Sequence, residues 1–293
     1  MLLKNFFYIW LSVLLLSPCP LLAESFEDTD NNYLPNIGVQ LWSVKGELKK
    51  DFTGTLKAVK NAGFNAVEFA GELGPYRNKP TELRKLLDAI GLKVSGAHIP
   101  IHHLQSESIE NTVSFYKTLG AEYLIVGWDP RSWDPQQIDE LILQLRTAHQ
   151  GVTERSLKFG FHNHDGEFQP FRESTFWDLI ATSTDQEFIL QLDIGWVVAA
   201  GKNPVSYLER YPGRAYSTHF KARIPKEAAT GKPIIGEDTT DWMSVLKATA
   251  TTGGTKWIIL EQEEYPDGMS SIEALKASKK GLDGYIQAYL SKP

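Results

Sequence analysis

Cysteine is almost absent from this 293-residue chain. The only one is Cys19, so no disulfide can form within the chain and stability must come from a hydrophobic core. With 42% apolar residues, the chain is long enough to bury a large core. Basic residues are also scarce: 30 Lys and Arg face 36 Asp and Glu, a net charge of −6. A basic surplus for a phosphate backbone is missing, so we expect no nucleic-acid partner.

The sequence also lacks an apolar run of the ~20 residues that a membrane-spanning helix needs. Its most apolar stretch, residues 6–16, follows Lys4 and precedes a small residue, Ala23. A basic start, a short apolar run and a small residue are typical of a secretory signal. We therefore expect residues 1–23 to be a signal peptide and the mature protein to be periplasmic or secreted, with no stable membrane span. The alternatives are an uncleaved anchor and a lipoprotein cleaved before Cys19.

After this segment the pattern becomes regular. Residues 24–36 are polar and are expected to form a flexible leader, followed by one domain over residues 37–293. In that domain, short apolar runs alternate with segments of helical periodicity. The expected strands are 37–43, 66–69, 93–98, 123–126, 158–162, 189–193, 215–220 and 257–261. The expected helices are 51–62, 80–90, 108–119, 135–155, 174–183, 203–210, 240–252 and 271–290.

Eight alternating strands and helices match an α/β fold of the (β/α)₈ type, the TIM barrel, in both count and size. The alternative is an open, doubly wound parallel sheet. Such a sheet usually carries a glycine-rich phosphate turn after its first strand, and the first strand here ends in Gln40-Leu41-Trp42-Ser43 instead. The sequence therefore favours the closed barrel.

Residues that can bind a metal end the predicted strands. The C-terminal ends of barrel strands meet at one mouth, so these side chains should converge. Four come from consecutive strands, about 4.8 Å apart: His162, Asp193, His219 and Glu261. Two imidazoles and two carboxylates suit Mn²⁺, Zn²⁺, Co²⁺ or Fe²⁺ better than Mg²⁺ or Ca²⁺. We expect one such ion. For each residue taken alone, the alternative is a capping or salt-bridge role.

The segments around these residues resemble the xylose isomerase-like TIM barrels, a family also described as sugar phosphate isomerase/epimerase-like. The resemblance covers nearly the whole chain after residue 23. Its early segments are IGVQLWSV at 37–44, NAGFNAVEF at 61–69 and GLKVSGAH at 91–98. Its later segments are FGFHNHDGEF at 159–168, LQLDIGW at 190–196, STHFKAR at 217–223, IGEDTTDW at 235–242 and WIILEQEEY at 257–265.

The resemblance implies an enzyme in which one divalent ion, held by side chains from strands five to eight, binds a carbonyl sugar. By position, the same four residues are the implied ligands. Two positions depart from the ketose epimerases of the family: His162 stands where they have a glutamate, and Trp196 where they have a histidine. The two metal-bound glutamates of those epimerases are therefore not both present here, which argues against simple epimerisation of a free ketose.

Proton transfer is the chemistry that such a site supports. A divalent ion at a carbonyl oxygen stabilises the enediolate that forms when the neighbouring carbon loses its proton. We expect Glu261 or His164 to be the base and Lys221 to orient a sugar oxygen. The main prediction is an isomerase or epimerase acting on a carbonyl sugar or keto-glycoside. The alternatives are a lyase acting by β-elimination on 3-keto-glycosides and a non-catalytic sugar-binding barrel; the acidic charge balance disfavours a DNA-repair endonuclease.

Further residues near the strand ends are expected to contact the substrate. Tryptophan faces stack on sugar rings, and carboxylates and imidazoles bind hydroxyls. Packing at the rim and salt bridges are the alternative roles. The expected substrate-binding residues are Trp42, Glu68, His98, Trp128, Trp196 and Glu237. If the protein is exported, neutral sugars or glycosides are the expected partners. The sequence leaves the sugar, the metal and the oligomeric state open.

Overall fold

The computed structural model describes residues 33–105, 108–225 and 230–291. The predicted signal peptide and most of the predicted leader lie outside these residues, so both segments and the export of the protein stay predictions. Within the described residues, no helix combines the length and apolar character needed to cross a membrane.

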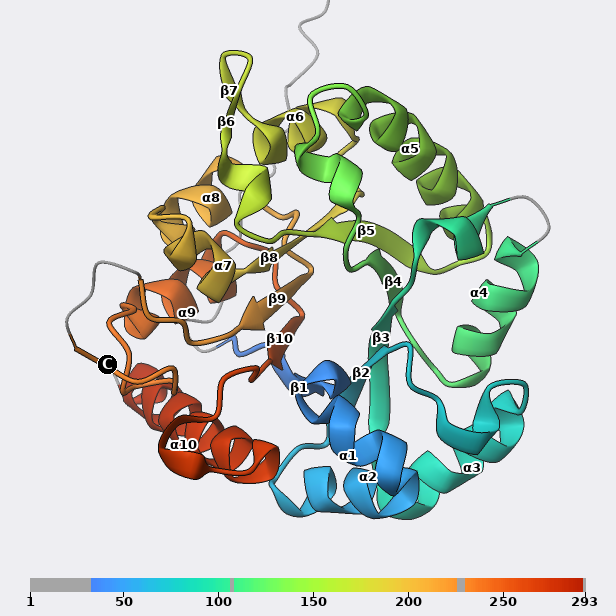
Figure 1. The fold of residues 1–293 in the computed structure, drawn as a ribbon, viewed down its shortest axis with the longest axis vertical. Coiled ribbons are helices and arrows are strands. Elements are labelled where there is room, and N and C mark those ends of the chain that lie inside the picture. The colour runs from blue at the N-terminus through green and yellow to red at the C-terminus, as the bar shows by residue number, and fades with distance from the viewer. Residues whose placement is uncertain (1–32, 106–107, 226–229, 292–293) are drawn as a thin grey trace, which may run out of the picture. The chain divides into compact units, whose positions relative to one another are not determined.

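Eight parallel strands close into a barrel, as the sequence predicts. They are β1 (Asn36–Gln40), β2 (Ala66–Ala70), β3 (Lys93–His98), β4 (Tyr123–Val126), β5 (Lys158–His162), β8 (Ile189–Asp193), β9 (Ser217–Phe220) and β10 (Trp257–Leu260). Their order around the barrel is β1-β10-β9-β8-β5-β4-β3-β2. Figure 1 shows the strands at the centre with the helices around them. The described residues form a single TIM barrel.

Helices follow the strands and cover the outside of the barrel. They are α1 (Lys45–Lys50), α2 (Phe52–Asn61), α3 (Pro80–Ile90), α4 (Ile109–Thr118), α5 (Ile138–Glu154), α6 (Phe176–Ser183), α7 (Ile194–Ala199), α8 (Pro204–Arg210), α9 (Trp242–Thr251) and α10 (Ser271–Leu290). Several begin at a side-chain cap, which satisfies amide groups that the helix leaves free. Asp51 accepts from the Gly54 amide at 2.8 Å, and Ser270 forms a capping box with Glu273.

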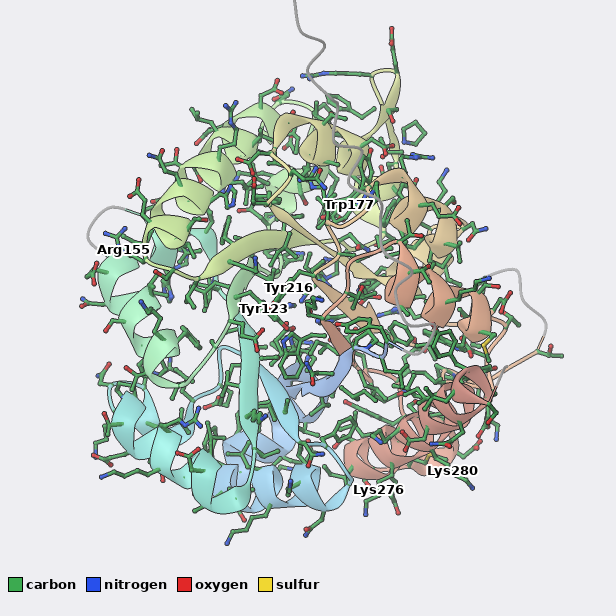
Figure 2. All side chains as sticks on the ribbon, turned by 180° about the vertical axis from the view of Figure 1, so that it is seen from behind. Tyr123, Arg155, Trp177, Tyr216, Lys276 and Lys280 are labelled. Carbon is green, nitrogen blue, oxygen red and sulfur yellow. The ribbon has the colours of Figure 1, made fainter. Side chains whose placement is uncertain are left out.

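Alternation along the strands separates two packed layers. Outward residues such as Phe161 and Leu190 join the large core between barrel and helices. Inward residues such as Tyr123 and Ile189 form a second cluster inside the barrel. Because side chains alternate with period two, the same inward phase continues toward the C-terminal ends of the strands, where polar residues replace the apolar ones. Viewed from behind, Tyr123 and Tyr216 lie near the centre of the ring, and Lys276 and Lys280 lie on α10 (Figure 2).

Several sequence-based boundaries differ from the structure by a few residues, and α1 is a helix that the sequence did not predict. β1 ends at Gln40, whose side chain accepts from the Trp42 amide at 3.1 Å and begins a 3-10 turn, η1 (Leu41–Val44). A small hairpin, β6 (Pro170–Phe171) and β7 (Ser174–Thr175), precedes α6. A short extra helix, α7, begins directly after β8. These elements depend on local caps and turns that hydrophobic periodicity does not register.

Candidate functional site

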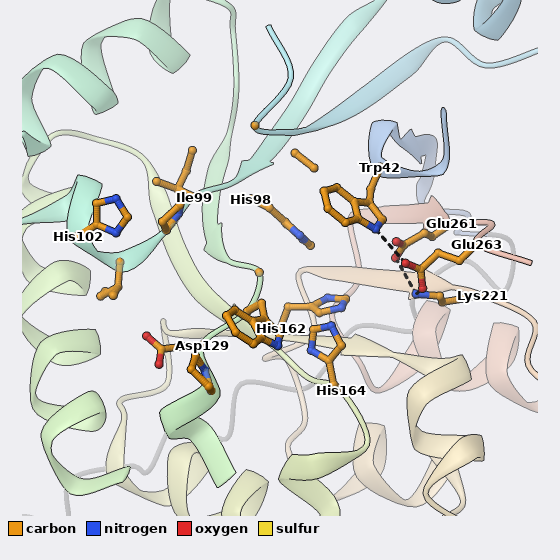
Figure 3. Close-up of a pocket in the computed structure, with 17 residues that line it drawn as sticks. Trp42, His98, Ile99, His102, Asp129, His162, His164, Lys221, Glu261 and Glu263 are labelled. Carbon is orange, nitrogen blue, oxygen red and sulfur yellow. Dashed lines mark hydrogen bonds and ion pairs between the residues drawn. The ribbon is translucent and has the colours of Figure 1, made fainter. Parts of the chain in front are cut away.

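A pocket of about 730 Å³ opens at the C-terminal ends of the strands. Loops after β1, β2, β3, β4, β5, β9 and β10 contribute to its wall (Figure 3). This is the end of the barrel where the sequence predicts the site. Seven of the predicted site residues line it: Trp42, His98, Trp128, His162, His164, Lys221 and Glu261.

The four predicted metal ligands meet beside this pocket. One possible ligand atom from each of His162, Asp193, His219 and Glu261 lies within 4.8 Å of all the others. All four side chains are buried, and they come from the ends of β5, β8, β9 and β10, which are neighbours in the barrel. Adjacent strands thus bring together residues that are up to 99 positions apart in the sequence.

The surroundings of Asp193 fit a bound cation. Its Oδ2 is buried and has no hydrogen-bond partner among the described residues. His162 Nε2 lies 3.7 Å and Lys221 Nζ lies 3.6 Å from this oxygen, both too far for a hydrogen bond. An unpartnered buried carboxylate oxygen is costly, and an ion between the four side chains would remove that cost. Two imidazoles and two carboxylates are a donor set for a divalent transition metal.

Glu68 lies beneath the histidines and does not line the pocket. Its Oε1 is 2.7 Å from His219 Nε2, 3.0 Å from His98 Nε2 and 2.7 Å from Gln40 Nε2. Its Oε2 accepts from Gln191 Nε2 at 2.9 Å. Burial alone would raise the pKa of Glu68, but His98 and His219 outweigh it and hold the pKa well below its usual value. The expected direct contact between Glu68 and the substrate is therefore corrected: the side chain is fully buried and orients its neighbours.

Lys221 is a buried ammonium that faces three carboxylates. Its Nζ lies 2.5 Å from Glu263 Oε2, 3.4 Å from Glu261 Oε2 and 3.6 Å from Asp193 Oδ2. Burial alone would lower the pKa of Lys221, but Glu261, Asp193 and Glu263 outweigh it and raise the pKa above its usual value. Lys221 therefore carries its charge over the whole physiological pH range.

His164 lines the pocket in its neutral form. Its Nδ1 is buried without a hydrogen-bond partner among the described residues. Burial, together with the charge of Lys221, lowers the pKa of His164 to about 4. The backbone is fixed, because the His164 amide donates to Glu167 Oε2 at 2.8 Å. The pocket therefore holds an imidazole that can accept a proton.

Two tryptophans flank the pocket. Trp42 is 41% exposed, and its Nε1 donates to Glu263 Oε1 at 2.9 Å. Lys45 Nζ lies 3.6 Å from the centre of the Trp42 ring. Trp128 is 57% exposed in the loop after β4. Both rings have free apolar area against which a ligand can pack.

Trp196 and Glu237 do not line the pocket. Trp196 lies on α7, directly after the Asp193 cap, and the centre of its ring is 3.5 Å from the Arg223 guanidinium. The ring also packs behind the pocket wall, 5.0 Å from Lys221 Nζ and 5.2 Å from the His164 ring. Glu237 is exposed in the loop before α9. Their expected contact with the substrate has no support in this geometry. Both residues follow strands in the sequence, but the path of the loop decides whether such a residue reaches the mouth.

Three residues of the site were not predicted. Gln191 Oε1 lies 3.0 Å from His162 Nδ1. Asn163 Oδ1 accepts from the Asp193 amide at 2.8 Å, and Glu263 contacts Lys221. Gln191 could have been predicted from the alternation of side chains along the strand, because it lies two residues before Asp193 and therefore faces the same way, into the barrel.

Known proteins share this architecture. A family model described as a xylose isomerase-like TIM barrel matches residues 56–286. The chain is 23% identical over 276 residues to the inosose dehydratase of Lacticaseibacillus casei, covering 81% of this chain and 91% of the relative. It is 21% identical over 262 residues to the rhizopine catabolism protein MocC of Rhizobium meliloti, covering 78% and 79%.

The fold also matches solved structures. A sugar phosphate isomerase/epimerase from Parabacteroides distasonis superposes with a TM-score of 0.68 at 21% identity, covering 88% of this chain and 99% of that one. The family model spans well over half of the sequence, and the closed barrel of the structure agrees with its description. The chain belongs to the xylose isomerase-like TIM barrel family.

Proposed function

We propose that this protein is a metal-dependent enzyme that removes the proton next to a carbonyl group in a polyhydroxylated substrate. The observation that carries the proposal is the unpartnered Asp193 oxygen within a four-residue ligand cluster. This cluster adjoins a pocket that also holds a neutral histidine and a charged lysine. The family membership and the named relatives support the same class of activity.

We include a metal ion in the proposal because four possible ligand side chains lie close enough together to bind one. His162, Asp193, His219 and Glu261 would hold one Mn²⁺, Zn²⁺, Co²⁺ or Fe²⁺ ion. When bound, such an ion supplies Lewis-acid polarisation of a substrate oxygen. The chain itself supplies the groups that move the proton and stabilise charge.

We assign the base to His164. It is neutral, lines the pocket and has a free ring nitrogen, as a proton acceptor requires. Glu261, the other predicted base, already contacts His219 at 2.9 Å and Lys221 at 3.4 Å and belongs to the ligand cluster. Lys221 lines the same pocket, and its ammonium can stabilise negative charge that develops on a substrate oxygen.

Elimination is the outcome that we favour. His164 takes the α-proton, and the C–H electron pair forms a carbon–carbon double bond. The C–O bond at the β-carbon breaks, and the departing oxygen receives a proton from Lys221. The inosose dehydratase among the relatives catalyses a dehydration, which is a reaction of this type. A neutral acceptor and a cationic donor in one pocket suit an elimination, which moves one proton in each direction.

Isomerisation or epimerisation is the second candidate. Here the proton returns to carbon, which needs groups placed at different sides of the substrate. Glu261 and His164 both line the pocket and come from β10 and the loop after β5, respectively, so they can serve two sides. The replacement of a family glutamate by His162 is the reason that we rank this outcome second.

Proton NMR in D₂O separates these outcomes. Purified protein with Mn²⁺ is incubated with an inosose, free keto-sugars and keto-glycosides. Deuterium at an α-carbon of the intact skeleton supports an isomerase or epimerase, whereas an unsaturated product or a released alcohol supports a lyase. EDTA should abolish the reaction and Mn²⁺ or Co²⁺ should restore it. Sugar binding without exchange or turnover would contradict the enzyme proposal and favour a binding protein.

A further inference from the structure

The pocket has two sides of different chemistry. One side holds the reacting groups and includes His164, Lys221, Glu261 and Glu263. The other side, which we call the apolar lobe, is formed mainly by Ile99, Pro100 and Ile101 after β3 and by Trp128 and Pro130 after β4, with the polar His102 and Asp129 beside them. Figure 3 shows Ile99 well away from Lys221 and Glu263, with the histidines between them. A ligand that fills the pocket therefore meets polar and apolar walls at its two ends.

The apolar lobe is built on a fixed loop. Asp129 accepts from Arg131 Nε at 2.9 Å and from Arg131 Nη2 at 2.7 Å, and Ser132 Oγ donates to the Asp129 carbonyl at 2.6 Å. Trp133 packs edge-on against Trp128, with ring centroids 6.3 Å apart. These contacts hold the loop without covering Trp128, which stays 57% exposed. A large exposed aromatic ring on a rigid loop beside a pocket is typical of a binding surface.

The charged side chains that line the pocket disfavour a phosphate group. Among the described residues that line it, Lys221 carries the only ammonium or guanidinium group. That charge is already shared by Asp193, Glu261 and Glu263. Asp129 also lines the pocket, but Arg131, which pairs with it, does not. Apart from the proposed metal ion, a phosphate would find no unshared ammonium or guanidinium group and would meet carboxylates, so these charges favour an uncharged ligand.

The volume points to more than one ring. At about 730 Å³ the pocket lies within the range of ~300–1,000 Å³ that holds drug-sized ligands, so a single sugar ring fills only part of it. We propose that the substrate is an uncharged glycoside whose sugar ring occupies the reacting side and whose aromatic aglycone packs in the apolar lobe against Trp128. This inference rests on the proposed function, because it assumes that the sugar carbonyl faces His164 and Lys221.

Isothermal titration calorimetry with non-reacting analogues tests this assignment. The probes are phenyl β-glucoside, methyl β-glucoside and glucose 6-phosphate, titrated into the full protein with Mn²⁺. We expect phenyl glucoside to bind at least about tenfold more tightly than methyl glucoside, since it buries an aromatic ring. Glucose 6-phosphate should bind more weakly than either. Equal affinity for the two glucosides, no binding of either, or preferred binding of the phosphate would overturn the proposal.

Variants identify the lobe. Trp128→Ala should lower the affinity for phenyl glucoside by about three- to tenfold and change the affinity for methyl glucoside by less than about twofold. Trp128→Phe should retain part of the preference for phenyl glucoside. Trp42→Ala should weaken both glucosides by the same factor, because Trp42 lies on the sugar side near Glu263. Leu143→Ala is the control, since Leu143 is 64% exposed on α5 and does not line this pocket. A phenyl preference that is undiminished in Trp128→Ala contradicts the assignment.

The failure of this inference can be told apart from failure of the proposed function. Turnover of a keto-sugar in D₂O with no preference for the phenyl group would refute only the aglycone lobe. A clear phenyl preference that depends on Trp128, with no exchange or elimination on any keto-glycoside, would refute only the chemistry.

Discussion

Two histidines of the site have opposite electrostatic surroundings. For His219, burial alone would lower the pKa, but Glu68 and Glu261 outweigh it and raise the pKa to about 10. For His164, burial and the nearby Lys221 lower the pKa to about 4. Environments that separate the pKa values of like groups often mark distinct chemical roles. One imidazole belongs to the ligand cluster, and the other is left free to accept a proton.

Replacement of His164 tests its role as the base. His164→Ala should reduce α-proton exchange or product formation by at least about 100-fold, because general-base catalysis contributes that much or more. The bound metal should remain at the wild-type level, since His164 is not one of the four ligands. Exchange rates by NMR and metal content by mass spectrometry check both points. The control is His103→Ala, because His103 is exposed and does not line the pocket. An equal loss of activity in the two variants would argue against the assignment of His164 as the base.

Glu68 should act on the metal through His219. In Glu68→Gln an amide group can face the nitrogens that now contact a carboxylate, so His219 loses the partner that fixes its orientation. Substitution of such supporting residues typically weakens metal affinity by about 10- to 100-fold. Competition with a coloured chelator measures this change. Glu209→Gln, exposed on α8, should leave the affinity unchanged. Wild-type affinity in Glu68→Gln would show that Glu68 does not support the ligand.

At the level of elements, close packing between β5 and β8 depends on a glycine. A Cβ at Gly160 would lie 2.1 Å from the carbonyl oxygen of Ile189. Gly160→Ala should therefore destabilise the protein by about 3 kcal/mol or more, because backbone atoms must shift. Gly284→Ala on the exposed face of α10 meets nothing within 4 Å and should stabilise by about 0.5–1 kcal/mol. Urea denaturation measures the change in the free energy of unfolding for both variants. If both changes had the same sign, this account of the close packing between β5 and β8 would be contradicted.

Glu167 connects the loops after β4 and β5 in its protonated form. Ser132 Oγ lies 2.6 Å from the Asp129 carbonyl oxygen and 2.7 Å from Glu167 Oε1. The hydroxyl has one proton, and the carbonyl can only accept, so the contact with Glu167 needs a proton on the carboxyl group. Burial in this position raises the pKa of Glu167 to about 7, above the 4.5 of an exposed glutamate.

The raised pKa of Glu167 predicts how stability depends on pH. Between about pH 4.5 and 7 the folded state keeps a proton that the unfolded state has lost, so this group's favourable contribution falls as pH rises through about 7, by up to about 3 kcal/mol. Glu167→Gln, whose amide can donate to Ser132 and accept from His164, should remove that decline. Unfolding free energies at pH 4.5, 6 and 8 compare the two proteins. An identical pH dependence would exclude a buried, protonated Glu167.

The strands were predictable because their apolar runs end in polar residues, and the positions of loop residues were not. His162 and His219 lie within two-residue alternation on strands, so their inward direction follows from the sequence. Trp196 and Glu237 also follow strands, but neither lines the pocket: Trp196 packs behind His164 and Lys221, and Glu237 lies on an exposed loop. The Asp193 cap and the turn before α9 determine these positions, and hydrophobic periodicity carries no information about them.

For the molecule as a whole, barrel closure is what creates the site. The alternation of eight strands and helices predicts the barrel, and the barrel makes the ends of β5, β8, β9 and β10 neighbours. The geometry within the mouth required the structure: the burial of Glu68, the carboxylates around Lys221 and the apolar lobe all arise from contacts between distant segments. A single ion at the four strand ends is the claim on which the proposed chemistry depends.

Crystals grown with Mn²⁺ and measured at the manganese absorption edge test that claim most directly. We predict one anomalous peak within bonding distance of His162, Asp193, His219 and Glu261, and no such peak in Asp193→Ala crystals. No peak at this position, with Asp193 Oδ2 still without a bonded partner, or a peak elsewhere in the barrel would contradict the account.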